Sequence, residues 1–298
     1  MSSKAPSPPT AGVARKTATT TEATPEPDSD SPPSWRARLI GGEVPGVLGP
    51  LAVFGDHIRL ALDAFAWLFR PPFRTRLFIE QMEFIGVGSL PIILLVGFFT
   101  GMVTALQAAM ALQMFQQERW AGFAVGVALA QSLAPVFTAL MITARAGSGM
   151  ATELASMRVS EQIDALTTFA VNPVQYLVTP RIVASIVMLP VMTMVFNFVG
   201  LLGAYIVLVV IYNVDFGQLS ALFRFWTDPI DYVKGLIKAV VYGFTLSLAA
   251  CYQGFNVRGG AKEVGRATTR AVVVGSVSII ALDYFLIKIL SAIWPFVS

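Results

Sequence analysis

IGVGSLPIILLVGFFTGMVTALQAAMAL, residues 85–112, is the stretch that decides the fold. It contains no Asp, Glu, Lys, Arg or His, and it is longer than the ~20 apolar residues that cross a bilayer as a helix. A helix satisfies its backbone hydrogen bonds within the segment, which a lipid environment requires. The stretch therefore predicts a transmembrane helix.

The rest of the chain repeats this pattern. Of its 298 residues, 55% are hydrophobic and 13% are charged, whereas a soluble domain carries about 25% charged residues. We therefore expect an all-α polytopic membrane protein whose transmembrane domain covers residues 85–298. Four further spans are predicted, at 121–145, 181–212, 233–254 and 271–297.

The segment before the first span divides into two parts. Residues 1–46 are rich in Ser, Thr, Pro and Ala, so we expect a disordered cytoplasmic tail. Residues 47–84 are predicted to form interfacial, elbow-like helices. The first, at 50–70, is amphipathic and carries its charges along one stripe, which is typical of a helix lying in the membrane interface. Pro71-Pro72 should end it, and a second short helix is expected at 73–84.

Basic residues near the span ends indicate the orientation. Four basic residues lie on one side of the membrane, near the outer ends of the second and fourth predicted spans: Arg119, Arg224, Lys234 and Lys238. The opposite side carries many more: Arg59, Arg70, Arg74, Arg76, Arg145, Arg158, Arg181, Arg258, Lys262, Arg266 and Arg270. The N-terminus and the loop at 146–180 are therefore predicted to be cytoplasmic, and the C-terminus to be periplasmic if the cell is a bacterium.

That loop holds a polar insert, GSGMATELASMRVSEQIDAL, residues 147–166. Its apolar residues fall at helical spacing, which predicts two short amphipathic helices joined at Val159-Ser160. Ser160 suits an N-cap, and Asn172-Pro173 should end the second helix. Such helices either dock into a groove of a soluble partner or cap the bundle at the lipid headgroups. The residues alone leave these two interpretations open.

Three charged residues, Lys238, Asp283 and Lys288, fall inside predicted spans, where a charge is costly and points to a role. Asp283 lies about 18 Å from the inner end of its span and Lys238 about 24 Å, at ~1.5 Å per residue. A lysine side chain bridges a difference of roughly 6 Å, so we expect the two to pair between neighbouring helices. A structural pair that fixes helix register is the preferred interpretation, and direct contact with lipid is the alternative.

Three stretches also carry a resemblance to a known family. ARAGSGMATELASMRVSEQIDAL at 144–166, NPVQYLVTPR at 172–181 and GRATTRAVV at 265–273 resemble the permeases of the MlaE/YrbE type. These are the membrane subunits of MCE-associated ABC lipid transporters. The resemblance covers roughly residues 50–298.

The resemblance implies a bacterial inner-membrane homodimer that transports phospholipid or a related lipid. Its partners would be a cytoplasmic ABC ATPase, a periplasmic MCE-domain protein and, in many systems, a STAS-domain protein. ATP and Mg would bind to the ATPase, and no cofactor is expected in this chain. The polar insert would be the element that contacts the ATPase, through Glu153, Arg158, Glu161, Gln162 and Asp164.

The resemblance further implies a lipid cavity at the dimer interface. We place Leu106, Gln107 and Met110 near its outer mouth. One departure stands out in the second span, where family members commonly have Glu-Leu-Gly-Pro. This chain reads Ser132-Leu133-Ala134-Pro135, so any role of that glutamate cannot be transferred to it.

Two other classes of function compete with an ATP-driven permease. A secondary transporter or channel would work without an ATPase, and it would favour inverted repeats that five spans do not supply. An intramembrane enzyme would need a nucleophile and base at one depth, but Cys251 and His57 are the only residues of their kinds and lie far apart. The sequence has no phosphate-binding G-x-x-x-x-G-K-[ST] motif, no pattern for a metal site, and only a small net charge that argues against nucleic acid.

Overall fold

The computed structural model describes residues 49–68, 75–117, 120–214 and 229–294. Every regular element in these ranges is helical, which confirms the all-α class. The predicted tail at 1–46 and the Pro71-Pro72 helix end lie outside the described residues. Among the described residues, five helical runs are long and apolar enough to cross a bilayer: Thr75–Gln113, Ala121–Val159, Val174–Ile211, Pro229–Phe255 and Ala261–Ile293.

The predicted N-terminal helices are present. The amphipathic stretch forms α2 (Gly49–Leu68), with Leu60 and Ala64 buried against the other helices. The short helix α3 (Thr75–Ile85) follows, and a 3-10 turn, η1 (Val87–Ser89), connects it to α4 (Leu90–Gln113). Pro91 lies in the first turn of α4, where a proline leaves the hydrogen-bond ladder intact.

The second run is longer than the sequence predicts. It passes from α5 (Ala121–Ala128) into α6 (Ala134–Ile142) and then α7 (Ser148–Val159), and π-helical turns join them at η3 (Leu129–Leu133) and η4 (Thr143–Gly147). We expected a loop to begin at 146, but the first helix of the polar insert continues the span. Falling hydropathy does not end a helix, and α7 has its own buried face against α11 and α12.

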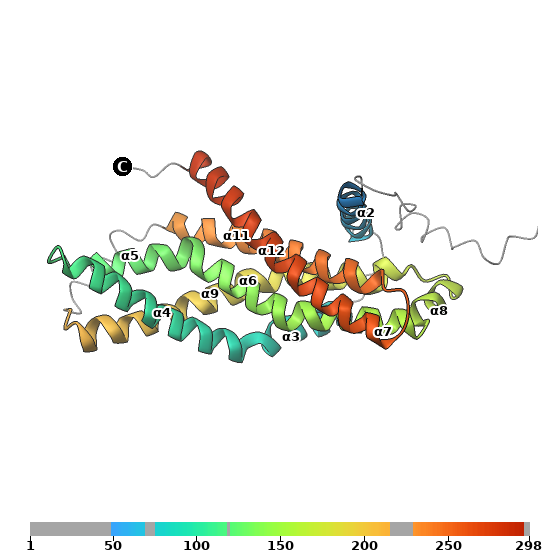
Figure 1. Ribbon diagram of the computed structural model, residues 1–298, viewed down its shortest axis with the longest axis horizontal. Coiled ribbons are helices and arrows are strands. Elements are labelled where there is room, and N and C mark those ends of the chain that lie inside the picture. The colour runs from blue at the N-terminus through green and yellow to red at the C-terminus, as the bar shows by residue number, and fades with distance from the viewer. Residues whose placement is uncertain (1–48, 69–74, 118–119, 215–228, 295–298) are drawn as a thin grey trace, which may run out of the picture. The chain divides into compact units, whose positions relative to one another are not determined.

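The remaining helices complete the bundle in Figure 1. The third run contains η5 (Val174–Val178), α9 (Thr179–Ile206) and η6 (Val207–Ile211). The last two runs are the single helices α11 (Pro229–Phe255) and α12 (Ala261–Ile293). Helix α9 packs against α4 on one side and α11 on the other, and α11 packs against α12.

Glycines allow the closest of these approaches. A Cβ atom at Gly101 of α4 would overlap the carbonyl of Gly200 in α9, and one at Gly203 would overlap the carbonyl of Phe98. Gly97, four residues before Gly101, faces the Phe196 carbonyl. The Gly-x-x-x-Gly motif of the first span therefore serves packing within the chain, since small residues let two membrane helices approach.

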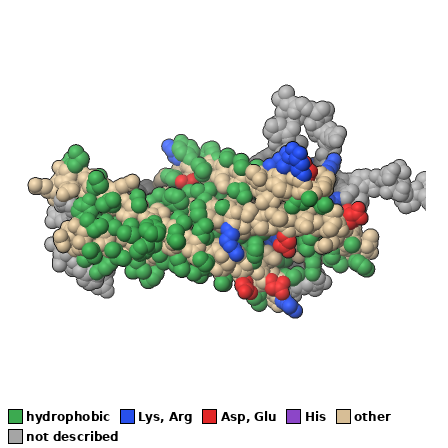
Figure 2. All heavy atoms as spheres, turned by 60° about the horizontal axis from the view of Figure 1, so that its bottom comes forward, with side chains coloured by type: hydrophobic (Ala, Val, Ile, Leu, Met, Phe, Trp, Pro, Cys, Tyr) green, Lys and Arg blue, Asp and Glu red, His purple; other side chains and the backbone are tan. Residues whose placement is uncertain are grey.

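Large apolar side chains remain on the outside of the bundle, as expected for helices that face lipid or another subunit. Figure 2 shows them over most of one face, with most of the charged side chains toward the end where Figure 1 places α7 and α8. One exposed row follows α4: Leu95, Phe99, Val103, Leu106 and Met110. Another follows α12: Val273, Val277, Ile280 and Tyr284.

Candidate functional site

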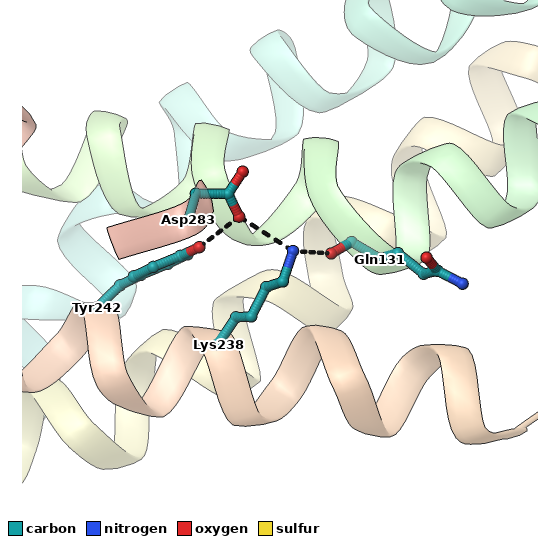
Figure 3. Close-up of polar contacts among 4 residues, drawn as sticks. All are labelled: Gln131, Lys238, Tyr242 and Asp283. Atoms are coloured by element: carbon teal, nitrogen blue, oxygen red, sulfur yellow. Dashed lines mark hydrogen bonds and ion pairs between the residues drawn. The ribbon is translucent and has the colours of Figure 1, made fainter. Parts of the chain in front are cut away.

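A polar cluster lies among the spanning helices, and Figure 3 shows its members. Lys238 of α11 lies 3.0 Å from the Oδ1 atom of Asp283 in α12. Tyr242, one turn further along α11, donates a 2.6 Å hydrogen bond to the same oxygen. The Lys238 side chain is 3% exposed and that of Asp283 is 19% exposed, so this is a largely buried pair. The structure thus brings together the two charges that the depth estimate paired.

The third partner of the cluster was not anticipated. The Lys238 ammonium also donates a 2.8 Å hydrogen bond to the backbone carbonyl of Gln131 in η3. In an α-helix that carbonyl would accept from the amide four residues later, but residue 135 is proline and has no N–H. Gly235 makes the contact possible, because a Cβ atom there would overlap the Ala130 carbonyl and push α11 away.

The Gln131 side chain extends the cluster toward the start of α11. Its amide nitrogen donates to Asp231 at 2.7 Å, and Asp231 lies 4.0 Å from the ammonium of Lys234. Two carboxylates and two ammonium groups are thus arranged along α11, α12 and η3. Buried charges are tolerated when they are paired and hydrogen-bonded, so the cluster can fix the register of three helices.

The polar insert is held by two ion pairs. Arg158 in α7 binds Asp164 of α8 (Gln162–Thr168) at 2.9 Å. Glu153 of α7 binds Arg181 at the start of α9 at 2.8 Å, and Arg181 also donates to the Leu177 carbonyl at 2.7 Å. The Arg181 side chain is 4% exposed, whereas Glu153 is 48% exposed. Three of the five predicted coupling residues therefore hold α7 and α8 in position.

The other two lie on the exposed turn between these helices. Glu161 has φ 59°, a left-handed conformation that is uncommon for any residue but glycine, and Gln162 begins α8. Our assignment of Ser160 as the N-cap is wrong, because Ser160 ends α7 and donates back to the Ser156 carbonyl. Glu161 is the N-cap residue instead, through its backbone alone.

The second helix of the insert also ends earlier than predicted. It stops at Thr168, and Ala170 follows with φ 58°. Asn172-Pro173 begins the next run, since the Asn172 side chain accepts from the Val174 amide at 2.9 Å. Phe169 is left 78% exposed beside this turn. Glu161 and Gln162 thus form the exposed turn between the two helices, which we name the α7–α8 tip.

Arg145 is a structural residue that sequence reasoning used only as a charge. It lies in η4, donates a 2.8 Å hydrogen bond to the Phe84 carbonyl near the end of α3, and sits 5.4 Å from the centre of the Phe84 ring. It also reaches the Ser89 hydroxyl at 3.3 Å. Arg145 therefore ties the second run to the bend between α3 and α4. The sequence signal for this role was an arginine placed at the end of an otherwise apolar predicted span, two residues before Gly147.

The predicted lipid-cavity residues lie on one face of α4. Leu106, Gln107 and Met110 are exposed and belong to the outward row on that helix. They do not meet the polar cluster within the chain. Ser132, where the family glutamate was expected, is half-buried in η3 beside Gln131.

Comparison with known proteins gives consistent matches. A family model described as permease MlaE matches residues 78–289. A probable ABC transporter permease protein of Rickettsia prowazekii is 40% identical over 256 residues, which cover 85% of this chain and 96% of the relative. The intermembrane phospholipid transport system permease protein MlaE of Haemophilus influenzae is 35% identical over 215 residues, 72% of this chain and 82% of the relative. The chloroplastic protein TRIGALACTOSYLDIACYLGLYCEROL 1 of Arabidopsis thaliana is 34% identical over 208 residues, 70% of this chain and 59% of the relative.

Proposed function

Because the chain belongs to the MlaE permease family, we propose that it is the membrane subunit of an ATP-driven transporter that moves phospholipids or related lipids between the inner membrane and a periplasmic MCE ring. It works as a homodimer and has no catalytic chemistry of its own. ATP and Mg bind to a separate cytoplasmic ABC ATPase. A STAS-domain protein is a further candidate partner on that side.

The observation that carries this proposal is the α7–α8 tip. It is exposed, it is braced by the Arg158–Asp164 and Glu153–Arg181 pairs, and it contains the left-handed Glu161. A non-glycine residue is held in that conformation only where the surroundings over-determine it, and such residues concentrate at functional sites. A braced exposed tip is suited to receive a push from a soluble subunit.

The second helical run gives that push a path into the membrane. It continues without a loop from α5 to α7, and its two π-helical turns lie where it contacts other elements. At η4, Arg145 holds the α3–α4 bend, and at η3, the Gln131 carbonyl holds Lys238. Movement of the tip would therefore shift α4, α11 and α12 together.

The exposed row on α4 is the surface proposed for lipid. Leu106 and Met110 belong to it, and Gln107 adds a polar group beside them. Acyl chains need an apolar wall with few polar contacts, which this face provides. In the homodimer two such faces would enclose the transport cavity.

The test is purification of the full chain from its native membrane, followed by lipid transfer between labelled donor liposomes and acceptor liposomes. We expect an ATPase to co-purify and transfer to require ATP. Glu161→Lys should lose the ATPase, because it reverses a charge at the tip. Glu80→Lys is the matched control, since Glu80 is exposed on α3 and pairs with a neighbour on its own helix, Arg76. Full ATPase binding by Glu161→Lys would contradict the proposed contact.

A further inference from the structure

One side of α12 carries a continuous row of exposed residues that changes from basic to apolar along the helix. Its members in chain order are Lys262, Arg266, Arg270, Val273, Val277, Ile280 and Tyr284. At ~100° per residue, all of them fall within about 80° of the helix circumference. The buried residues Ala271 and Gly275 lie on the opposite side. We name this row the α12 stripe.

The basic part of the α12 stripe keeps an excess of positive charge. Residues 258–270 contain four basic residues and one acidic residue, Glu263, which pairs with Arg266 at 2.6 Å. Within the described part of the chain, the ion pairs include neither Lys262 nor Arg270. The chain itself therefore supplies one carboxylate to this end of the stripe.

The placement of these cations is unfavourable for the helix alone. Lys262 lies in the first turn of α12, where the positive end of the helix dipole repels a cation. Lys262, Arg266 and Arg270 follow one another at intervals of four residues, and like charges at that spacing destabilise a helix. An anion that faces the stripe would offset both effects.

The apolar part of the α12 stripe has the length of one leaflet. Arg270 is followed by twelve residues without a charge, up to Leu282. From Arg270 to Ile280 the helix rises about 15 Å at ~1.5 Å per residue, which is half of the ~30 Å hydrocarbon core. The basic end of α12 packs beside α7 (Figure 1), and the charge bias predicts that this end is cytoplasmic.

An anionic lipid is the occupant that matches both parts of the stripe. Its phosphate and its acyl chains follow one another in the same order as the cations and the apolar side chains. A soluble partner would not reach Val277 or Ile280 inside the bilayer. A second copy in the same orientation would place its own Arg270 opposite this one at the same height, and like charges facing each other repel.

We propose that the α12 stripe binds an anionic glycerophospholipid of the leaflet at its basic end. Lys262, Arg266 and Arg270 hold the headgroup phosphate, because their long side chains can extend to the membrane surface. The acyl chains lie along Val273 and Val277. The site selects the charge of the headgroup, and it depends neither on the transport function nor on the ATPase.

Photolabelling of the full chain tests the site. The protein is placed in phosphatidylcholine nanodiscs that contain a small fraction of phosphatidylglycerol with a diazirine on its acyl chain. A parallel sample contains the same label on phosphatidylcholine, and mass spectrometry maps the labelled peptides. We expect Val273 and Val277 to be labelled more than about tenfold better by phosphatidylglycerol, since three cations contribute and each is worth about fivefold in affinity.

Matched variants assign this preference to the cations. Arg270→Gln should lower it about fivefold, whereas Arg270→Lys keeps the charge and should retain most of it. Arg76→Gln is the control, because Arg76 is 91% exposed on α3 and pairs with Glu80 there. That change should leave the labelling of α12 unaltered.

Three results would overturn the proposal. The first is equal labelling of the stripe by the two lipids, or an undiminished preference in Arg270→Gln. The second is loss of the label when inorganic phosphate replaces chloride at constant ionic strength, which would indicate a site for free phosphate. The third is an unlabelled stripe in samples where the exposed face of α4 is labelled, which would show that protein covers it.

Discussion

The ammonium of Lys238 in α11 donates a 2.8 Å hydrogen bond to the backbone carbonyl of Gln131 in η3, and these two residues are 107 positions apart in the sequence. Pro135 leaves that carbonyl without its usual amide donor, and Lys238 supplies the missing proton donor while it pairs with Asp283. One side chain thus joins the second, fourth and fifth helical runs. The polar cluster therefore connects three helical runs of the bundle.

Removal of one member of the buried pair should destabilise the protein strongly. Asp283→Asn leaves the Lys238 charge without its counter-charge, and loss of one partner of a buried pair costs about 3 kcal/mol. The double variant Lys238→Met with Asp283→Leu removes both charges and should cost less than the two single changes added together, by about 1 kcal/mol or more. Thermal unfolding in detergent compares the unchanged protein, Asp283→Asn, the single variants Lys238→Met and Asp283→Leu, and the double variant. Simple additivity would show that the two side chains are not coupled.

Gly235→Ala should separate α11 from η3. The added Cβ atom overlaps the Ala130 carbonyl, so the helices must move apart and the Lys238–Gln131 hydrogen bond is lost. We expect a destabilisation of about 1–3 kcal/mol. Gly265→Ala in α12 is the matched control, because nothing lies within 4 Å of its new Cβ. That change should stabilise the protein by about 0.5–1 kcal/mol through helix propensity. Equal effects of the two substitutions on unfolding temperature would refute the close contact.

Glu161→Gly separates the backbone of the tip from its side chain. Glycine accepts the left-handed φ of 59° without strain, so the turn should become more stable by about 1 kcal/mol. The carboxylate is lost at the same time, and we expect ATPase binding to weaken despite the stabler turn. Gln162→Gly, at the first residue of α8, relieves no left-handed backbone and should not stabilise the turn. Hydrogen exchange of the tip amides measures the stability of the turn, and co-purification measures binding of the ATPase. A Glu161→Gly variant with a more stable turn and unweakened ATPase binding would contradict a role of the carboxylate in binding.

Arg145→Met should uncouple ATP hydrolysis from transport. The substitution removes the hydrogen bond to the Phe84 carbonyl, so the second run no longer holds the α3–α4 bend. The α7–α8 tip is unchanged, and ATPase binding should persist while lipid moved per ATP falls severalfold. Arg76→Met is the control, since that residue is exposed and pairs with Glu80 on its own helix. Loss of ATPase binding in Arg145→Met would instead assign Arg145 to the docking surface.

Hydropathy predicted the five runs because each contains a long, predominantly apolar stretch, and this signal does not depend on how the helices pack. It did not predict where helices end. Residues 146–159 are polar yet helical, because nothing in them breaks the backbone ladder and α7 gains burial against α11 and α12. A fall in hydropathy marks where the chain leaves the hydrocarbon region, whereas a helix ends only where residues interrupt its backbone hydrogen bonds.

The site was predictable to the extent that it depends on depth. Lys238 and Asp283 could be paired by counting residues from the span ends. The Gln131 carbonyl could not be found that way, although Pro135 four residues later was a visible sign that an acceptor is free. The left-handed Glu161 had no sequence signal, because glutamate does not favour that conformation and no glycine or asparagine marks the turn.

The most direct measurement is lipid transfer by the purified chain in proteoliposomes, with and without its co-purifying ATPase. We predict no transfer above background by the chain alone, ATP-dependent transfer with the ATPase present, and loss of that transfer in Glu161→Lys but not Glu80→Lys. Transfer by the chain alone at the full rate, indifferent to ATP and to Glu161, would contradict a permease driven through the α7–α8 tip.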